Sequence, residues 1–74
     1  MIYFQPRWVF DQALIDREGD RAVYSLTKLI GLLMRHEGMT EEQAIEWVSY
    51  NMQSTGLKDW PVIVNDHILG AYEA

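Results

Sequence analysis

The chain contains no cysteine and only two histidines, which limits the metal chemistry open to it. Without cysteine there is neither a disulfide nor a thiolate ligand for zinc. His36 and His67 lie far apart and form no metal-ligand spacing. His36 falls at the end of a predicted helix, where favourable interaction with the helix dipole is explanation enough. We expect neither a metal site nor a cofactor.

Catalytic motifs are missing as well. None of the patterns G-x-S-x-G, G-x-G-x-x-G and G-x-x-x-x-G-K-[ST] occurs. Glu42 and Glu46 form a carboxylate pair at i, i+4, but on the solvated side of a predicted helix, where nothing pushes their pKa values apart. A chain of 74 residues also has little room for a ligand cleft of a few hundred cubic ångströms. We expect a protein that is not an enzyme.

Long apolar runs are also lacking. None approaches the roughly 18 residues that span a membrane. Residues 1–10, MIYFQPRWVF, lack the charged start and long apolar segment of a signal peptide. The expected location is therefore a reducing cytoplasm.

Basic residues are few, with six Lys and Arg against eleven Asp and Glu, for a net charge of −5. This balance disfavours nucleic acid as a direct ligand, because phosphate binding depends on clustered bases. It is compatible with a basic protein partner, although most acidic small proteins are simply soluble. Aromatic residues are plentiful, with three Trp, four Tyr and two Phe. Part of that aromatic surface is expected to be exposed, as at protein interfaces.

Two extended segments are predicted near the start of the chain. Residues 8–15, WVFDQALI, are rich in aromatic and branched side chains and predict a strand. Their alternation is imperfect, so we expect a bulge or a central strand covered on both faces. Residues 16–20, DREGD, predict a hairpin loop, and residues 21–25, RAVYS, the returning strand.

Two helices follow. Ser25 is a plausible N-cap for the first helix, which is predicted to end near Gly38. Thr40 and Gln43 form the T-x-x-Q pattern of a capping box at the start of the second. This helix is predicted to stop by residues 55–56.

The rest of the chain predicts a short buried strand at residues 61–64, PVIV, and a turn at residues 65–67. Residues 68–74 are expected to form a last strand or a docked tail. The sequence therefore predicts one α+β domain over residues 1–74, with a three- to four-stranded sheet packed on two helices in the order β-β-α-α-β or β-β-α-α-β-β.

The second helix has an unusual outer face. Its core stripe is predicted to consist of Ala44, Ile45, Val48 and Met52. At about 100° per residue, Trp47 falls to one side of this stripe and Tyr50 nearly opposite. One interpretation is a partner-binding patch, in which Trp47 and Tyr50 are anchors while Glu42 and Glu46 meet Arg or Lys. The other is structural, with Trp47 wedged between helices and Tyr50 packed under the tail.

A second acidic group surrounds the predicted hairpin and comprises Asp11, Asp16, Glu18 and Asp20. It is partly balanced by Arg17 and Arg21, so one expectation is that these acids only keep the loop soluble. If they lie beside Glu37, Glu41, Glu42 and Glu46, the combined field imitates a phosphate track. Residues at i, i+4 stand about 6 Å apart, which is close to the spacing of phosphates along one nucleic-acid strand.

The N-terminal arm, with Ile2, Tyr3 and Phe4 before Pro6, is apolar and expected to be extended. Three roles are open for it: an added edge strand, packing on the core, or binding to a second copy.

The segments FDQALI, VYS, GMTEEQAIEWVSYNM and PVIV resemble a group of small phage-encoded proteins of unassigned function. The resemblance covers about residues 10–64. Its most distinctive part is G-M-T-x-E-x-A-x-E-aromatic followed by aromatic-Asn, here Gly38 to Asn51. Those proteins carry a Gly-aromatic connector before the last strand, where this chain has STGLKDW, so any role of that connector does not transfer. The resemblance implies that an aromatic residue at position 50 is part of the fold.

The resemblance also implies a phage or prophage origin and a place in the host cytoplasm. Small acidic phage proteins are often inhibitors of host defence, including anti-CRISPR proteins that bind Cas proteins, some as DNA mimics. The expected function is therefore a non-enzymatic anti-CRISPR that binds a basic Cas subunit and blocks nucleic-acid binding. The predicted partner-binding residues are Glu42, Glu46, Trp47, Tyr50, Asp16, Glu18 and Asp20. The alternative is a structural or regulatory phage protein, monomer or homodimer, whose aromatic surface serves self-association.

Overall fold

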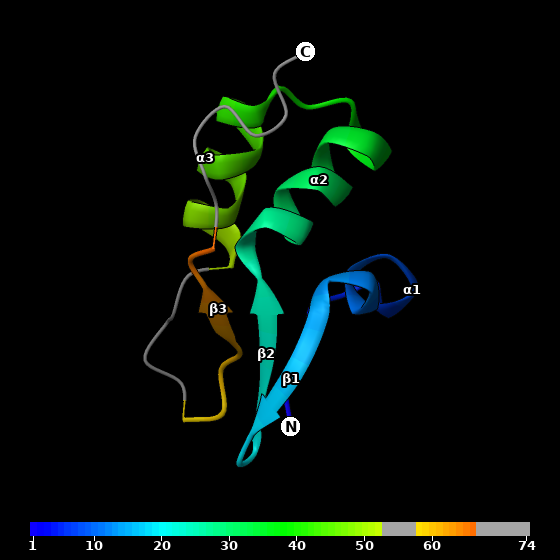
Figure 1. The fold of residues 1–74 in the computed structure, drawn as a ribbon. Coiled ribbons are helices and arrows are strands. Elements are labelled where there is room, and N and C mark those ends of the chain that lie inside the picture. Colours follow the sequence, from blue (N-terminus) through cyan, green and yellow to red (C-terminus); the bar gives the residue numbers. More distant parts are fainter. Residues whose placement is uncertain (53–57, 67–74) are drawn as a thin grey trace.

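The computed structural model describes residues 1–52 and 58–66 (Figure 1). Its elements, in chain order, are α1 (Arg7–Phe10), the 3-10 helix η1 (Asp11–Ala13), β1 (Leu14–Glu18), β2 (Arg21–Ser25), α2 (Leu26–Glu37), α3 (Glu41–Asn51) and β3 (Val62–Val64). The prediction of an α+β fold, with a small sheet and two main helices, is confirmed. The predicted end of the second helix at 55–56 and the strand or tail at 68–74 lie outside the described residues.

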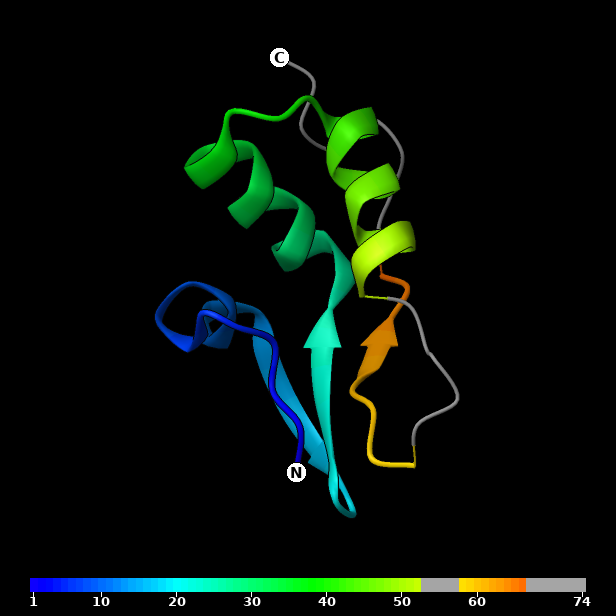
Figure 2. The same ribbon diagram turned by 180° about the vertical axis from the view of Figure 1, so that it is seen from behind.

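The described sheet has the strand order β1-β2-β3, with β1 antiparallel and β3 parallel to β2. A parallel neighbour requires a crossover connection, and α2 and α3 lie in that crossover. Both helices lie beyond the end of the sheet toward which β2 runs, and the β1–β2 turn lies at the far end (Figures 1 and 2). The molecule is consequently elongated, measuring 37 × 22 × 19 Å.

The predicted strand at residues 8–15 is wrong over most of its length. Arg7–Phe10 form α1, because the carbonyl oxygen of Pro6 accepts hydrogen bonds from the backbone N–H groups of Val9 and Phe10, at 3.2 and 3.1 Å. Val9, Phe10 and Ala13 are all buried, and their i, i+1, i+4 spacing belongs to a helical turn rather than to a strand.

The hairpin is tighter than predicted. Asp16 to Glu18 belong to β1, and only Gly19 and Asp20 form the turn, with Gly19 at φ +59°. A glycine suits this left-handed conformation because it has no Cβ. The pairing register shifts between Leu14 and Asp16, which confirms a bulge in this segment. The alternative of a central strand is wrong, because β1 is at the edge of the described sheet.

The predicted helix boundaries at residues 25, 38 and 40 are confirmed. The Ser25 hydroxyl accepts a hydrogen bond from the Lys28 N–H at 3.2 Å and caps α2. Gly38 ends that helix at φ +67°. Thr40 and Gln43 form both hydrogen bonds of the capping box, at 3.2 and 3.0 Å.

Asp66 joins the end of β3 to the start of α2. Its carboxylate accepts hydrogen bonds from the Ser25 hydroxyl at 2.6 Å and from the Thr27 N–H at 2.9 Å. The pKa of Asp66 lies below its ordinary value: burial raises it, but these hydrogen bonds to the ionised form lower it more. The Asp66 N–H also donates to the Val64 carbonyl at 2.9 Å, in the region of the predicted turn.

The core is shared by the N-terminal segment, β2 and both main helices. It contains Phe4, Val9, Phe10, Ala13, Ala22, Tyr24, Leu29, Ile30, Leu32, Leu33, Ala44, Val48 and Met52. Of the three roles open for the N-terminal arm, the structure shows the second: the arm packs on the core. Phe4 lies 4.6 Å from Tyr24 and 5.8 Å from Trp60 between ring centroids.

Candidate partner-binding surface

The outer face of α3 carries Glu42, Gln43, Glu46, Ser49 and Tyr50, which are all exposed. Tyr50 is 87% exposed, the largest exposed fraction among the large apolar side chains described. The structural interpretation of Tyr50, which the family resemblance also implies, has no support in this exposure. Since α3 carries no Lys or Arg, its outer face combines a free aromatic ring with acidic charge alone.

Trp47 lies at the border between this face and the core. It is partly buried, and its ring stacks on Phe10 at 6.3 Å between centroids, with 21° between the ring planes. The structural interpretation of Trp47 is therefore partly right, although its ring neighbour belongs to α1. The predicted core stripe of α3 is confirmed, with Ala44, Val48 and Met52 buried and Ile45 packed against the core.

The hairpin acids Asp16, Glu18 and Asp20 are exposed. Asp16 accepts a hydrogen bond from the backbone N–H of Arg17 at 2.7 Å. The two neighbouring arginines donate from Nε to carbonyl oxygens at 2.8 Å, Arg17 to Gly19 and Arg21 to Trp60. Arg17 therefore fastens the hairpin turn, and Arg21 ties β2 to the segment that precedes β3.

The two acidic groups do not share one surface. The β1–β2 turn lies at one end of the long axis of the molecule, and α3 begins at the opposite end (Figures 1 and 2). Glu41, which the sequence places with Glu42 and Glu46, is buried. A continuous phosphate-like track along both groups is therefore not formed.

A pocket of about 370 Å³ lies between α1, the C-terminal half of α2 and α3. We call it the α1–α3 pocket. Its lining residues are Gln5, Pro6, Trp8, Val9, Phe10, Leu32, Leu33, His36, Glu37, Met39 and Trp47. The expectation, drawn from chain length, that so small a chain has little room for a cleft of a few hundred cubic ångströms is wrong. One wall of the pocket is helix α1, which lies in the segment predicted as a strand.

Trp8 and His36 stand at the rim of the α1–α3 pocket. Trp8 is 73% exposed, and its ring meets the His36 ring edge to face, at 5.9 Å between centroids and 90° between planes. No group of three or more metal-binding side chains occurs among the described residues, and His67 lies outside them. Trp8 was predicted only as part of a strand. The helical spacing of the apolar residues Val9, Phe10 and Ala13 was the signal for a helix here.

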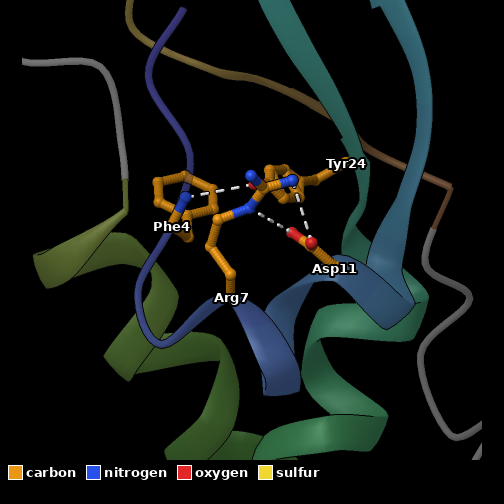
Figure 3. Close-up of polar contacts among 4 residues, drawn as sticks. All are labelled: Phe4, Arg7, Asp11 and Tyr24. Atoms are coloured by element: carbon orange, nitrogen blue, oxygen red, sulfur yellow. Dashed lines mark hydrogen bonds and ion pairs between the residues drawn. The ribbon is translucent and has the colours of Figure 1, made fainter.

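Arg7, the neighbour of Trp8, is held away from the pocket. Its guanidinium group forms an ion pair with Asp11 at 2.9 Å and lies 3.8 Å from the centre of the Tyr3 ring. The hydrogen bond to Asp11 raises the pKa of Arg7. Figure 3 shows this pair beside the hydrogen bond from the Phe4 N–H to the buried Tyr24 hydroxyl, at 3.1 Å. The hydrogen bond fixes the arm against β2, and the contact of Arg7 with Tyr3 links α1 to the arm.

None of the described helices has the length and apolar character needed to cross a bilayer. Comparison of the chain with protein-family models, curated proteins and solved structures finds no match.

Proposed function

We propose that this protein is a non-enzymatic inhibitor that binds a basic, nucleic-acid-binding host protein through the outer face of α3. Binding there excludes nucleic acid from the partner. The resemblance to small phage-encoded proteins makes a Cas subunit the most concrete partner, and the protein then acts as an anti-CRISPR in the host cytoplasm.

The observation that carries this proposal is the exposure of Tyr50 on a helix face whose charges are all acidic. Glu42, Glu46 and Tyr50 follow one another at i, i+4, i+8, so they form one row along α3. A rigid aromatic ring flanked by carboxylates suits a partner surface that is rich in Arg and Lys. Trp47 extends the row toward the α1–α3 pocket and adds apolar contact.

The hairpin acids have no part in this contact, because they lie at the other end of the molecule (Figure 1). The partner therefore meets a compact acidic and aromatic surface rather than a long DNA-like track. The hairpin acids, which lie outside this contact, supply a matched control, because reversing two charges on the hairpin changes the net charge as much as reversing two on α3.

The experiment is a pull-down from host lysate with the wild-type protein, the variant E42K/E46K and the control variant E18K/D20K. The wild type and the control are expected to retain the same nucleic-acid-binding protein, which added DNA or RNA displaces, while E42K/E46K loses it. Equal capture by all three variants would contradict the proposal. Capture of the protein's own copies alone, seen as a dimer by light scattering, would favour self-association instead.

A further inference from the structure

The α1–α3 pocket has an apolar floor and an aromatic rim. Val9, Phe10, Leu32 and Leu33 are buried and form the floor. The rim carries the rings of Trp8, His36 and Trp47. Such a pocket holds a side chain or small group that is flat, partly apolar and able to stack on rings.

The charge of the pocket is one-sided. Among the described residues that line it there is one carboxylate, that of Glu37, and no Lys or Arg. Arg7 is paired with Asp11 and covers Tyr3, and Arg35 is not part of the lining. A cation that enters the pocket therefore meets aromatic faces, His36 among them, and a carboxylate, and no Lys or Arg of the lining opposes it.

Arginine fits this chemistry better than lysine. Its guanidinium group is planar, stacks on aromatic rings and is more weakly hydrated than an ammonium group, so less hydration is lost on entering an apolar pocket. The molecule already contains one such contact, since Arg7 lies over the Tyr3 ring at 3.8 Å.

We infer that the α1–α3 pocket receives an arginine side chain of the basic partner, with its guanidinium group against Trp8 and Trp47 and near the carboxylate of Glu37. This inference rests on the proposed function for the identity of the partner and deepens it. The outer face of α3 provides the electrostatic attraction, and the pocket provides selectivity for arginine.

The test uses short peptides and the indole N–H signals of the tryptophans in NMR spectra of the labelled protein. The peptides are acetyl-Gly-Arg-Gly-amide, its citrulline counterpart, which has the same shape without the charge, and its lysine counterpart. Trp60 is an internal control, because its indole N–H donates to the Met52 carbonyl at 2.9 Å and Trp60 is not in the pocket lining.

The arginine peptide is expected to shift the signals of Trp8 and Trp47 and to leave Trp60 in place. The citrulline peptide should bind at least about fivefold more weakly, the size of a cation–π contribution near 1 kcal/mol. The lysine peptide should also bind more weakly, because an ammonium group does not stack on rings and is more strongly hydrated. In the variant W8A the remaining Trp47 shift should fall by a similar factor. The control variant I15A, at an exposed residue of β1 outside the pocket lining, should match the wild type. W8A is expected to fold because Trp8 is largely exposed.

Equal shifts with citrulline or lysine would overturn the inference, as would shifts with none of the peptides. Signals that move with protein concentration alone would mean that a second copy fills the pocket, and the inference would fail. The proposed function fails separately: if E42K/E46K keeps the partner in the pull-down, the acidic surface is rejected. Arginine-selective shifts of Trp8 and Trp47 in the wild type would still support the pocket in that case.

Discussion

The ring of Trp47 stacks on the ring of Phe10, with 6.3 Å between centroids and 21° between planes. This contact joins α3 to α1, two helices far apart in the sequence. It fixes one side of Trp47 in the core while the other side borders the outer face of α3. One residue thus links the stability of the fold to the proposed binding surface.

Replacing Trp47 by alanine should lower the free energy of unfolding by about 2 kcal/mol. The expected loss is smaller than for a fully buried tryptophan because Trp47 is only partly buried. Y50A is the matched control and should stay within about 0.5 kcal/mol of the wild type, since Tyr50 is 87% exposed. Urea unfolding measures both. A loss for Y50A as large as for W47A would mean that Tyr50 has a structural role.

The ends of α2 and α3 could be predicted from the sequence because they are set by capping residues next to them. Ser25, Thr40 with Gln43, and Gly38 act within one helical turn, so caps and terminators can be read from neighbouring residues. The outer face of α3 was predicted for the same reason, because helical periodicity alone determines which residues of a capped helix point away from the core.

The segment around Trp8 and Phe10 was mispredicted because short aromatic and branched runs fit both a strand and a helix. Phe10, Ala13 and Ile15 do not share one parity, and this predicted a bulge or a central strand covered on both faces. Only Ile15 lies at the bulge, while Phe10 and Ala13 belong to helical turns. The α1–α3 pocket could not be predicted, because it depends on tertiary contacts between three helices.

Replacing Tyr24 by phenylalanine should lower the free energy of unfolding by about 1–2 kcal/mol. The variant removes the acceptor of the Phe4 N–H and leaves a buried donor unpaired. Burial raises the pKa of Tyr24, so the wild type should also lose stability as pH rises above about 10, where the unfolded phenol ionises first. Urea midpoints between about pH 8 and pH 11 measure both effects. If Y24F lost the same amount of stability at alkaline pH as the wild type, the loss would come from titratable groups other than Tyr24.

Replacing Asp66 by asparagine should lower the free energy of unfolding at neutral pH by about 1 kcal/mol, as for the loss of a helix cap. The pKa of Asp66 is lowered in the folded protein, so its stabilisation is present above the ordinary value of 3.8 and is lost as pH falls through the folded value. The difference between the wild type and D66N should therefore shrink on acidification. A difference independent of pH would show that the charge of Asp66 contributes nothing.

Replacing Gly38 by alanine should lower the free energy of unfolding by about 1 kcal/mol, because φ is +67° and alanine is strained there. No atom lies within 4 Å of an added Cβ, so the cost comes from the backbone alone. G38N is the matched control and should lose less, since asparagine tolerates this conformation better. Thermal unfolding separates the two variants. Equal losses in the two variants would contradict the assignment of the cost to the left-handed backbone conformation.

The most direct measurement of the central claim is the dissociation constant of the captured partner as a function of salt concentration. If the outer face of α3 replaces phosphate-like contacts, wild-type affinity should fall steeply with salt. E42K/E46K should bind at least about tenfold more weakly at low salt, a loss of about 1.4 kcal/mol, and with a smaller slope. E18K/D20K should follow the wild type more closely than E42K/E46K does. Wild-type affinity that is flat across salt, or full affinity in E42K/E46K, would contradict the account.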